Sequence, residues 1–305
     1  MDNGKRKSCW LTLLVLLVLG RHGFGQQESN LVAGQQEPNV VAESAALLDT
    51  FTGEFLFQKN ADARQYPASA TKILTALIVI EAGELDKIVT VDPADTKVEP
   101  SSLDLKPGEQ YPRRQLLYGL LLKSANDVAL ALARDDAGSV EAFVEKMNQR
   151  ASELGATSSH FANPHGLHDP NHYTTAHDLA LIARAAMQQP FLREIVSTIY
   201  YTWRSPSRGA YQLRNHNRLL RHFAGCNGLK TGFTRAAQQV LVSSALREGH
   251  EVVSVVLHTN KPGIWDDSKT LLTYGLVKLG CPPESIADTT DRADEPGDSE
   301  DGQGQ

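Results

Sequence analysis

The sequence predicts an α+β fold in which an antiparallel sheet is flanked by helices and joined to an all-helical region. Two apolar runs near the start, at 45–49 and 55–58, are connected by a turn that contains Gly53, a pattern typical of a β-hairpin. Two more apolar runs near the end, at 239–245 and 251–257, surround a short polar turn. Because helical patterns fill the chain between these two pairs, we expect its first and last strands to complete one sheet.

The helical segments are recognised by their apolar spacing and by their end signals. The first follows Pro67, carries a crowded apolar face and stops before Gly83. Another opens at Thr175 and Asp178, which have the spacing of a capping box. The helices predicted in this way are 69–82, 116–122, 128–132, 140–154, 175–187 and 268–279, and a short strand is predicted at 88–91.

The charge of the chain is concentrated at its two ends. The 305 residues carry a formal net charge of −6, but residues 1–25 hold +3 and residues 286–305 hold −6, which leaves the body at −3. A body so close to neutral has no basic stripe with interleaved aromatic residues, so we expect no nucleic-acid partner. The chain is long enough to bury a substantial core without disulfides or metal.

Residues 1–25 have the pattern of a secretory signal peptide. A basic segment at 5–7 precedes an apolar segment at 9–20, and small residues at 23–25 fit cleavage before Gln26. The apolar segment is short for a membrane-spanning helix, and an uncleaved N-terminal anchor is the alternative. In both cases the body is exported, to the periplasm or another extracytoplasmic part of the cell envelope. An uncleaved segment is the one expected route to membrane association.

The rest of the chain divides into three parts by composition. Polar residues 26–43 suggest a flexible lead-in, and residues 44–281 form the body. Residues 282–305 are rich in Asp, Glu and Gly, so we expect a disordered acidic tail. Export also permits a disulfide between Cys226 and Cys281. The sequence leaves open whether these two pair or are separate buried cysteines.

A serine and a lysine at the start of the first predicted helix have the spacing S-x-x-K. Residues three apart share one face of a helix, so the amine of Lys72 can reach the hydroxyl of Ser69. A serine hydroxyl is a poor nucleophile until a neighbouring base takes its proton. Lysine can be that base only when its pKa falls from about 10.4 towards 7, which burial and a second cation achieve. By itself this motif is common and arises by chance.

Two later motifs supply the remaining groups. Ser124 and Asn126 lie in the polar break between two apolar helices, where they would relay a proton and hold both the base and a substrate amide. An ordinary helix–helix turn is the alternative. Lys230, Thr231 and Gly232 follow on a predicted strand, where Lys230 would be the second cation and Gly232 would let another backbone approach. A surface strand with a glycine kink is the alternative.

In this order, S-x-x-K, S-x-N and K-T-G form the motif set of penicillin-binding proteins and serine β-lactamases. The surrounding residues resemble the low-molecular-mass D-alanyl-D-alanine carboxypeptidases over about 44–280. The resemblance implies a transpeptidase/β-lactamase-like fold with the site between the sheet and the all-helical region, and it makes 44–281 the catalytic domain. The segments that carry it are 67–72, 121–127, 161–167, 215–220 and 228–234.

The resemblance also implies a role for each matching residue. Ser69 is acylated with Lys72 as its base, Ser124 completes the catalytic network, and the backbone N–H groups of Ser69 and Phe233 form the oxyanion hole. The implied substrate-binding residues are Asn126, Lys230, Thr231, Gly232 and Thr234.

The implied activity is that of a serine-type D-Ala-D-Ala carboxypeptidase. It trims peptidoglycan stem peptides that end in D-Ala-D-Ala, it needs no cofactor and no metal, and β-lactams inhibit it covalently. The fold also supports endopeptidase or β-lactamase activity, although 161–176 offers only Asp169 as a water-activating carboxylate. From another functional class, the alternative is a protein that binds muropeptides or penicillin without hydrolysis.

One residue departs from the family pattern, and one cluster of residues suggests a different kind of site. Relatives often carry an arginine before the last helix that helps to bind the terminal carboxylate, and the alignment places Ile264 there. Clustered histidines suggest zinc, but their spacing is irregular and prolines interrupt it, so we expect no metal site. These histidines are His160, His165, His168, His172 and His177.

Overall fold

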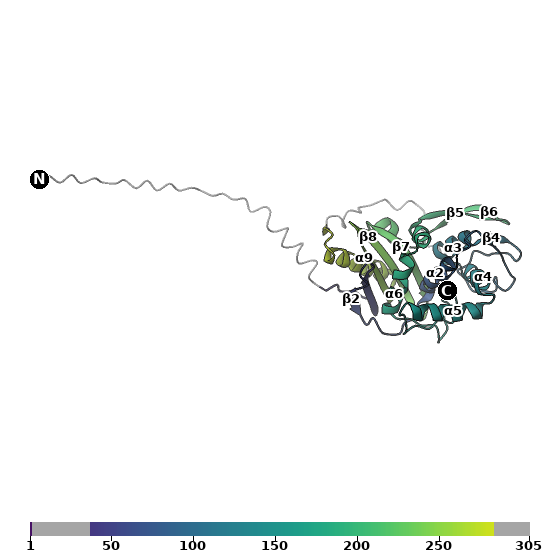
Figure 1. The fold of residues 1–305 in the computed structure, drawn as a ribbon, viewed down its shortest axis with the longest axis horizontal. Helices are drawn as coiled ribbons and strands as arrows, with labels where there is room; N and C mark the ends of the chain where they lie inside the picture. Colours follow the sequence, from purple (N-terminus) through teal and green to yellow (C-terminus); the bar gives the residue numbers. More distant parts are fainter. Residues whose placement is uncertain (2–36, 284–305) are drawn as a thin grey trace. The chain divides into compact units, whose positions relative to one another are not determined.

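The computed structural model describes Met1 and residues 37–283; the expected signal peptide, most of the expected lead-in and nearly all of the expected tail lie outside these residues. A five-stranded antiparallel sheet has the order β2-β1-β9-β8-β7 (Figure 1). Its strands are β1 (Ser44–Asp49), β2 (Phe55–Lys59), β7 (Cys226–Thr234), β8 (Gln238–Arg247) and β9 (His250–Thr259). The first strand pairs with the last, with Ala46 opposite Val255, which confirms the predicted α+β sheet.

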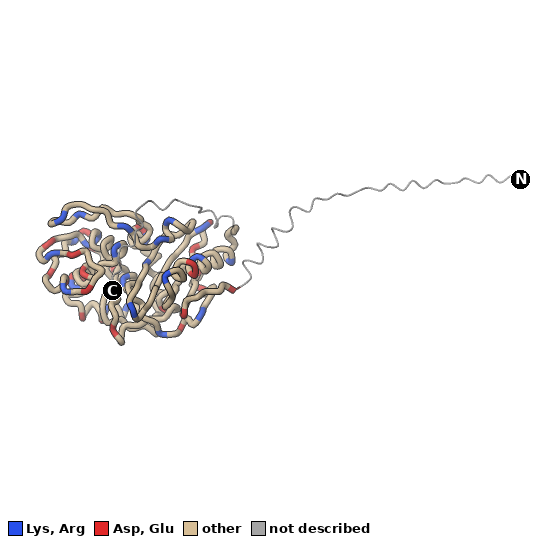
Figure 2. The backbone as a smooth tube through the Cα atoms, turned by 180° about the vertical axis from the view of Figure 1, so that it is seen from behind, with Lys and Arg blue, Asp and Glu red and all other residues tan. Residues whose placement is uncertain are grey.

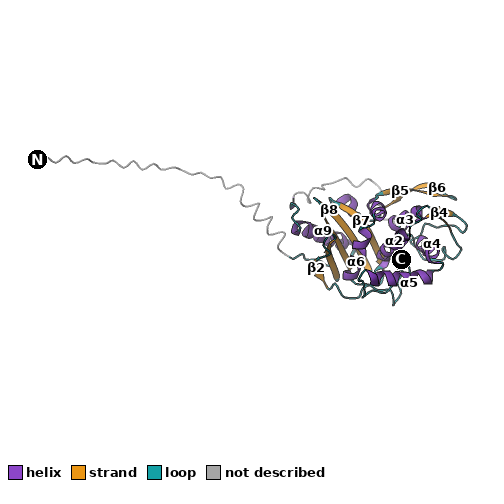
Figure 3. Ribbon diagram, in the orientation of Figure 1, coloured by secondary structure: helices purple, strands orange, loops and turns teal. Residues whose placement is uncertain are grey.

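Helices and short strands fill the chain between and after these strands (Figure 3). The helices are η1 (Ala68–Thr71), α2 (Lys72–Ala82), α3 (Arg113–Leu122), α4 (Asn126–Ala137), α5 (Val140–Glu153), α6 (Ala176–Met187), α7 (Pro190–Ser197), α8 (Leu219–His222) and α9 (Lys261–Lys278). Two small hairpins pair β3 (Ile88–Thr90) with β4 (Gln110–Pro112) and β5 (Tyr200–Ser205) with β6 (Gly209–Arg214).

Both faces of the sheet are covered, so the strands β1, β8 and β9 are largely apolar on both sides. On one face Leu47 and Val256 pack with α9. On the other, Leu48 and Val255 belong to the core shared with the all-helical region. Successive residues of β1 point to opposite faces, which explains why this short run is apolar throughout rather than alternating.

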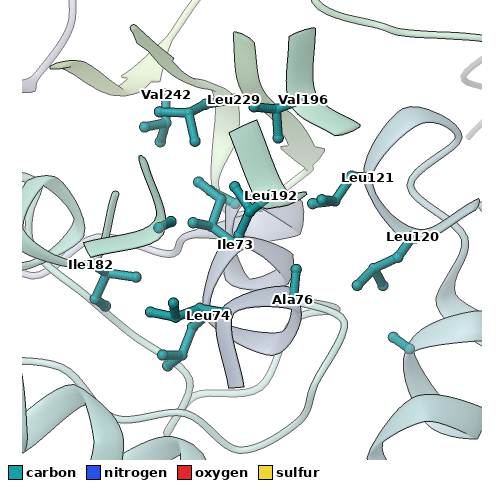
Figure 4. Packing of buried hydrophobic residues seen from close by; sticks show 14 of the residues in the cluster. Ile73, Leu74, Ala76, Leu120, Leu121, Ile182, Leu192, Val196, Leu229 and Val242 are labelled. Atoms are coloured by element: carbon teal, nitrogen blue, oxygen red, sulfur yellow. The ribbon is translucent and has the colours of Figure 1, made fainter. Parts of the chain in front are cut away.

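Helix α2 lies at the centre of the larger core (Figure 4). Ile73 and Leu74 lie among side chains from the sheet and from other helices, including Leu229 of β7 and Leu192 of α7. Packing on all sides matches the crowded apolar face expected for this segment. The helix ends before Gly83, as predicted. Its start differs from the prediction, because the first turn is the separate 3₁₀ segment η1.

The closing helix begins at Lys261, seven residues before the predicted start. The side chain of Asn260 caps it by accepting the N–H of Gly263 at 2.8 Å, and Pro262 lies in its first turn. The sequence prediction also omitted α7 and the β5–β6 hairpin. In that hairpin Trp203 and Leu213 are buried, whereas Thr202, Arg204 and Gln212 are exposed.

Lysine and arginine are interspersed with acidic residues over the described chain (Figure 2). None of the helices in residues 37–283 combines the length and the apolar character needed to cross a bilayer.

The described end of the expected lead-in is tied to α9. The buried carboxylate of Asp267 accepts the N–H groups of Val41 at 2.9 Å and Ala42 at 2.8 Å. Val40 and Ala42 pack into the core beneath α9. One carboxylate therefore joins the segment before β1 to the last helix.

Replacing Asp267 by alanine is expected to lower the free energy of unfolding by about 2 kcal/mol, because the buried amide of Ala42 loses its acceptor. Urea denaturation measures this change. Asp266→Ala alters the exposed neighbour and should stay within about 0.5 kcal/mol of the natural protein. Equal losses in the two variants would contradict the anchoring role.

Candidate active site

The S-x-x-K pair lies at the junction of η1 and α2. Ser69 is partly exposed, whereas Lys72 is fully buried. The Nζ atom of Lys72 is 3.0 Å from the Oγ atom of Ser69. The predicted spacing therefore produces direct contact between a buried amine and an accessible hydroxyl.

Lys72 has two further partners, both neutral oxygens. Its Nζ atom donates to the Oδ1 atom of Asn126 at 2.7 Å and to the backbone oxygen of His165 at 2.6 Å. A neutral amine has two N–H bonds and one lone pair. When the N–H bonds point to Asn126 and His165, the lone pair is left for the hydroxyl proton of Ser69.

The environment of Lys72 favours this neutral form. Burial lowers its pKa well below the ordinary value, and the charge of Lys230 lowers it further, while the carboxylate of Asp127 acts in the opposite direction. Asp127 uses its oxygens to accept the backbone N–H groups of Leu103 and Leu105. Burial and the charge of Lys230 are therefore the two factors that lower the pKa of Lys72, as a lysine base requires.

The loop between α3 and α4 orients the second motif. The Nδ2 atom of Asn126 donates to the backbone oxygen of Glu99 at 2.8 Å, which leaves its Oδ1 atom facing Lys72. Ser124 is nearly buried and has a positive φ of 65°, a conformation that few non-glycine residues adopt. The break predicted from the polar tripeptide is therefore a tight, specific turn.

The edge strand β7 passes directly beside η1. A Cβ atom added to Gly232 would lie 2.9 Å from the backbone nitrogen of Ser69, so only glycine permits this approach. Lys230 is buried in the same strand, and burial lowers its pKa to about 7. The three motifs therefore meet at one place, although they are far apart in sequence.

Thr231 of the third motif and Thr234, two residues after it, differ in their surroundings. Thr231 is partly exposed between Lys230 and Gly232. Thr234 lies at the end of β7, where its hydroxyl oxygen accepts the N–H of Ala237 at 3.0 Å. Thr234 is therefore part of the β7–β8 turn.

The loop 161–172 completes the surroundings of Lys72. The backbone oxygen of Pro164 accepts the hydroxyl of Thr75 at 2.7 Å, next to the contact between His165 and Lys72. Asn163 fixes the loop by accepting the N–H of Gly166 at 2.6 Å. Sequence reasoning gave His165 no role, because its contribution comes from the main chain.

Comparisons with known proteins agree with this geometry. A family model described as D-alanyl-D-alanine carboxypeptidase matches residues 31–261. The D-alanyl-D-alanine carboxypeptidase DacB2 of Mycobacterium tuberculosis is 36% identical, covering 79% of this chain and 84% of that protein. DacF of Bacillus subtilis is 33% identical over 82% of this chain, which spans 64% of its length. The crystal structure of the Streptomyces K15 DD-transpeptidase has a TM-score of 0.75 at 33% identity, covering 79% of this chain and 99% of that one.

The chain belongs to the D-alanyl-D-alanine carboxypeptidase family. It is a serine hydrolase of that family, with the transpeptidase-like arrangement of antiparallel sheet and helices that the motifs implied.

Ile264, expected to lie before the last helix at the place of the family arginine, lies within α9. Its side chain is 2% exposed and lies in the core between α9 and the sheet, on the face away from the all-helical region. A cation at this position would be buried among apolar groups. The aligned position therefore lies in the core in this carboxypeptidase.

The clustered histidines make separate contacts in this family member. In residues 37–283 no group of three or more His, Cys, Asp or Glu side chains is arranged to hold a metal ion. His160 contacts the backbone oxygen of Asn171, His168 lies against Tyr66, and His177 stacks on Phe55.

The two cysteines of the body are not bonded to each other. Both are free thiols, and the Sγ atom of Cys281 lies 3.4 Å from the backbone oxygen of Arg247.

Lys230→Met keeps the volume at this position and removes its charge. The pKa of Lys72 should then rise, and because the base acts in its deprotonated form, the increase of kcat/KM with pH should move to higher pH. D-Alanine release from a D-Ala-D-Ala peptide, measured across pH, tests this. Lys269→Met on α9 is the control and should leave the profile in place. A folded Lys230→Met protein with an unmoved profile would show that the two amines are not coupled.

Proposed function

We propose that Ser69 is the acylated nucleophile of an exported D-Ala-D-Ala carboxypeptidase that trims peptidoglycan stem peptides. One observation carries the proposal: the Nζ atom of the fully buried Lys72 lies 3.0 Å from the Oγ atom of Ser69, and its other two partners are the neutral oxygens of Asn126 and His165. That arrangement provides a base for a serine hydroxyl, which neither a binding protein nor a structural turn requires.

The reaction follows from the surrounding groups. Lys72 takes the hydroxyl proton while the Oγ atom of Ser69 bonds to the carbonyl carbon between the two D-alanines. The N–H groups of Ser69 and Phe233 hold the developing oxyanion, and Gly232 lets the strand that carries Phe233 lie beside η1. D-Alanine leaves after its nitrogen receives a proton through Lys72 and Ser124, and water then hydrolyses the ester.

Substrate binding falls to the third motif and to Asn126. The charged form of Lys230, with the hydroxyl of Thr231, binds the terminal carboxylate, and Asn126 contacts the substrate amide. The hydroxyl of Thr234 is expected to contribute less to binding this carboxylate, because its oxygen already accepts the N–H of Ala237. β-Lactams, which present a carboxylate and a reactive carbonyl, would acylate the same serine.

The loop 161–172 favours carboxypeptidase over β-lactamase activity. Its one acidic side chain, Asp169, accepts the N–H of Asn171 at 2.7 Å in a local turn. A carboxylate held in a local turn is a poor candidate for the water-activating base that fast hydrolysis of a penicilloyl ester needs.

Incubation with fluorescent penicillin followed by peptide mass spectrometry should find the label on Ser69. Ser69→Ala should abolish both the label and D-alanine release, whereas Ser197→Ala on the exposed end of α7 should preserve both. Label on another residue, or none on folded protein, would overturn the assignment. Cleavage of cross-linked dimers without D-alanine release would identify an endopeptidase instead.

A further inference from the structure

The peptide group between Ala68 and Ser69 has two ends with different partners. Its N–H belongs to Ser69 and is one of the two proposed oxyanion donors. Its C=O belongs to Ala68, whose φ of +46° is one that few L-residues adopt. A peptide held in this conformation needs contacts that fix its plane.

A buried chain of hydrogen bonds ends on that carbonyl. The hydroxyl of Thr71 donates to the oxygen of Ala68 at 2.8 Å. The oxygen of the same hydroxyl lies 2.8 Å from the Nε2 atom of His172. Thr71 and His172 are 0% and 1% exposed, so water does not compete for these contacts.

The direction of the chain follows from its far end. The Nδ1 atom of His172 lies 3.0 Å from the backbone nitrogen of Ala162, and an amide N–H can only donate. Nδ1 is therefore unprotonated, and the proton of the neutral imidazole is on Nε2. Nε2–H then donates to Thr71, which leaves the hydroxyl proton of Thr71 for the oxygen of Ala68.

The surroundings keep His172 neutral. Burial lowers its pKa to about 4, and of the nearby titratable groups Asp169 raises it while His160, Lys72 and His168 lower it. The ring also meets the edge of Phe161 at a centroid distance of 5.5 Å, which restricts its rotation.

The loop 161–172 also lies close to the Ala68 carbonyl at Gly166. A Cβ atom added to Gly166 would lie 1.8 Å from the oxygen of Ala68 and 2.9 Å from the Oγ1 atom of Thr71. The loop 161–172 thus bounds the Ala68 carbonyl sterically through Gly166 and holds it by hydrogen bonds through His172.

We propose that His172 and Thr71 are positioning residues for the oxyanion hole, acting through the carbonyl of Ala68. The chain from Ala162 to Ala68 fixes the plane of the Ala68–Ser69 peptide. Because a hydrogen bond to a C=O polarises the whole amide, the chain also strengthens the N–H of Ser69 as a donor. This inference rests on the proposed role of Ser69.

Thr71→Val and Thr71→Ser form the first matched pair. Valine keeps the shape but removes the hydroxyl, so kcat/KM for a D-Ala-D-Ala peptide should fall about tenfold, through kcat, with KM nearly unchanged. The inhibition constant of a peptide boronic acid, whose tetrahedral adduct on Ser69 mimics the oxyanion, should rise by a similar factor. Serine keeps the hydroxyl and should stay within about threefold of the natural protein in both measurements.

His172→Gln and His172→Asn form the second pair. A glutamine amide nitrogen reaches the ε position and can donate to Thr71, whereas an asparagine oxygen reaches the δ position and can accept from Ala162. If the chain acts on the oxyanion hole, glutamine should preserve more kcat than asparagine. If His172 merely holds the loop, asparagine should be the better replacement.

Thermal unfolding midpoints identify variants that lose activity because they are less folded. Penicillin labelling of the natural protein separates failure of the proposed function from failure of the positioning role. A natural protein without label on Ser69 would remove the proposed function and this inference with it. A labelled natural protein whose folded Thr71→Val variant keeps its kcat and its boronate affinity would overturn the positioning role alone. Equal losses in Thr71→Val and Thr71→Ser would also overturn it.

Discussion

The burial of Lys72 among neutral oxygens is the constraint on which the rest of the site depends. Its nitrogen meets the Ser69 hydroxyl, the Asn126 amide oxygen and the His165 carbonyl, and none of these carries a charge. The nearby carboxylate of Asp127 is occupied by backbone N–H groups of the loop at 103–105. An ammonium here would lose its hydration without gaining a direct counter-ion, so folding itself favours the free amine.

The sheet places the third motif beside Ser69. Because β7 is the edge strand of the sheet, its free side can lie along η1, and Gly232 brings the two backbones together. The apolar layers on both faces of the sheet hold that edge in place: Leu229 packs in the core shared with α2, immediately before Lys230. Core packing therefore sets the relative position of Ser69 and Lys230, and the close-packed core holds both residues in place.

Sequence reasoning succeeded where side chains carry the signal. The runs that became β1, β8 and β9 are apolar because both sheet faces are buried. The structure brings the side chains of Ser69, Lys72, Asn126 and Lys230 together, as the motifs predicted, and their roles stay a prediction. Sequence reasoning missed features that depend on main-chain atoms or on contacts between segments far apart in the sequence. His165 contacts Lys72 through its carbonyl, the β5–β6 hairpin is held by inward side chains such as Trp203 and Leu213, and the start of α9 depends on the Asn260 cap.

The two buried amines also link substrate binding to base activation. On the proposed assignment, a terminal carboxylate beside Lys230 favours the charged form of that lysine and raises its pKa from about 7. The charge held on Lys230 in turn lowers the pKa of Lys72. A substrate with a free carboxylate therefore keeps Lys230 charged, whereas an amidated substrate leaves Lys230 free to lose its proton. Selectivity for chain ends then follows from this ion pair, because only a substrate with a free terminal carboxylate can form it.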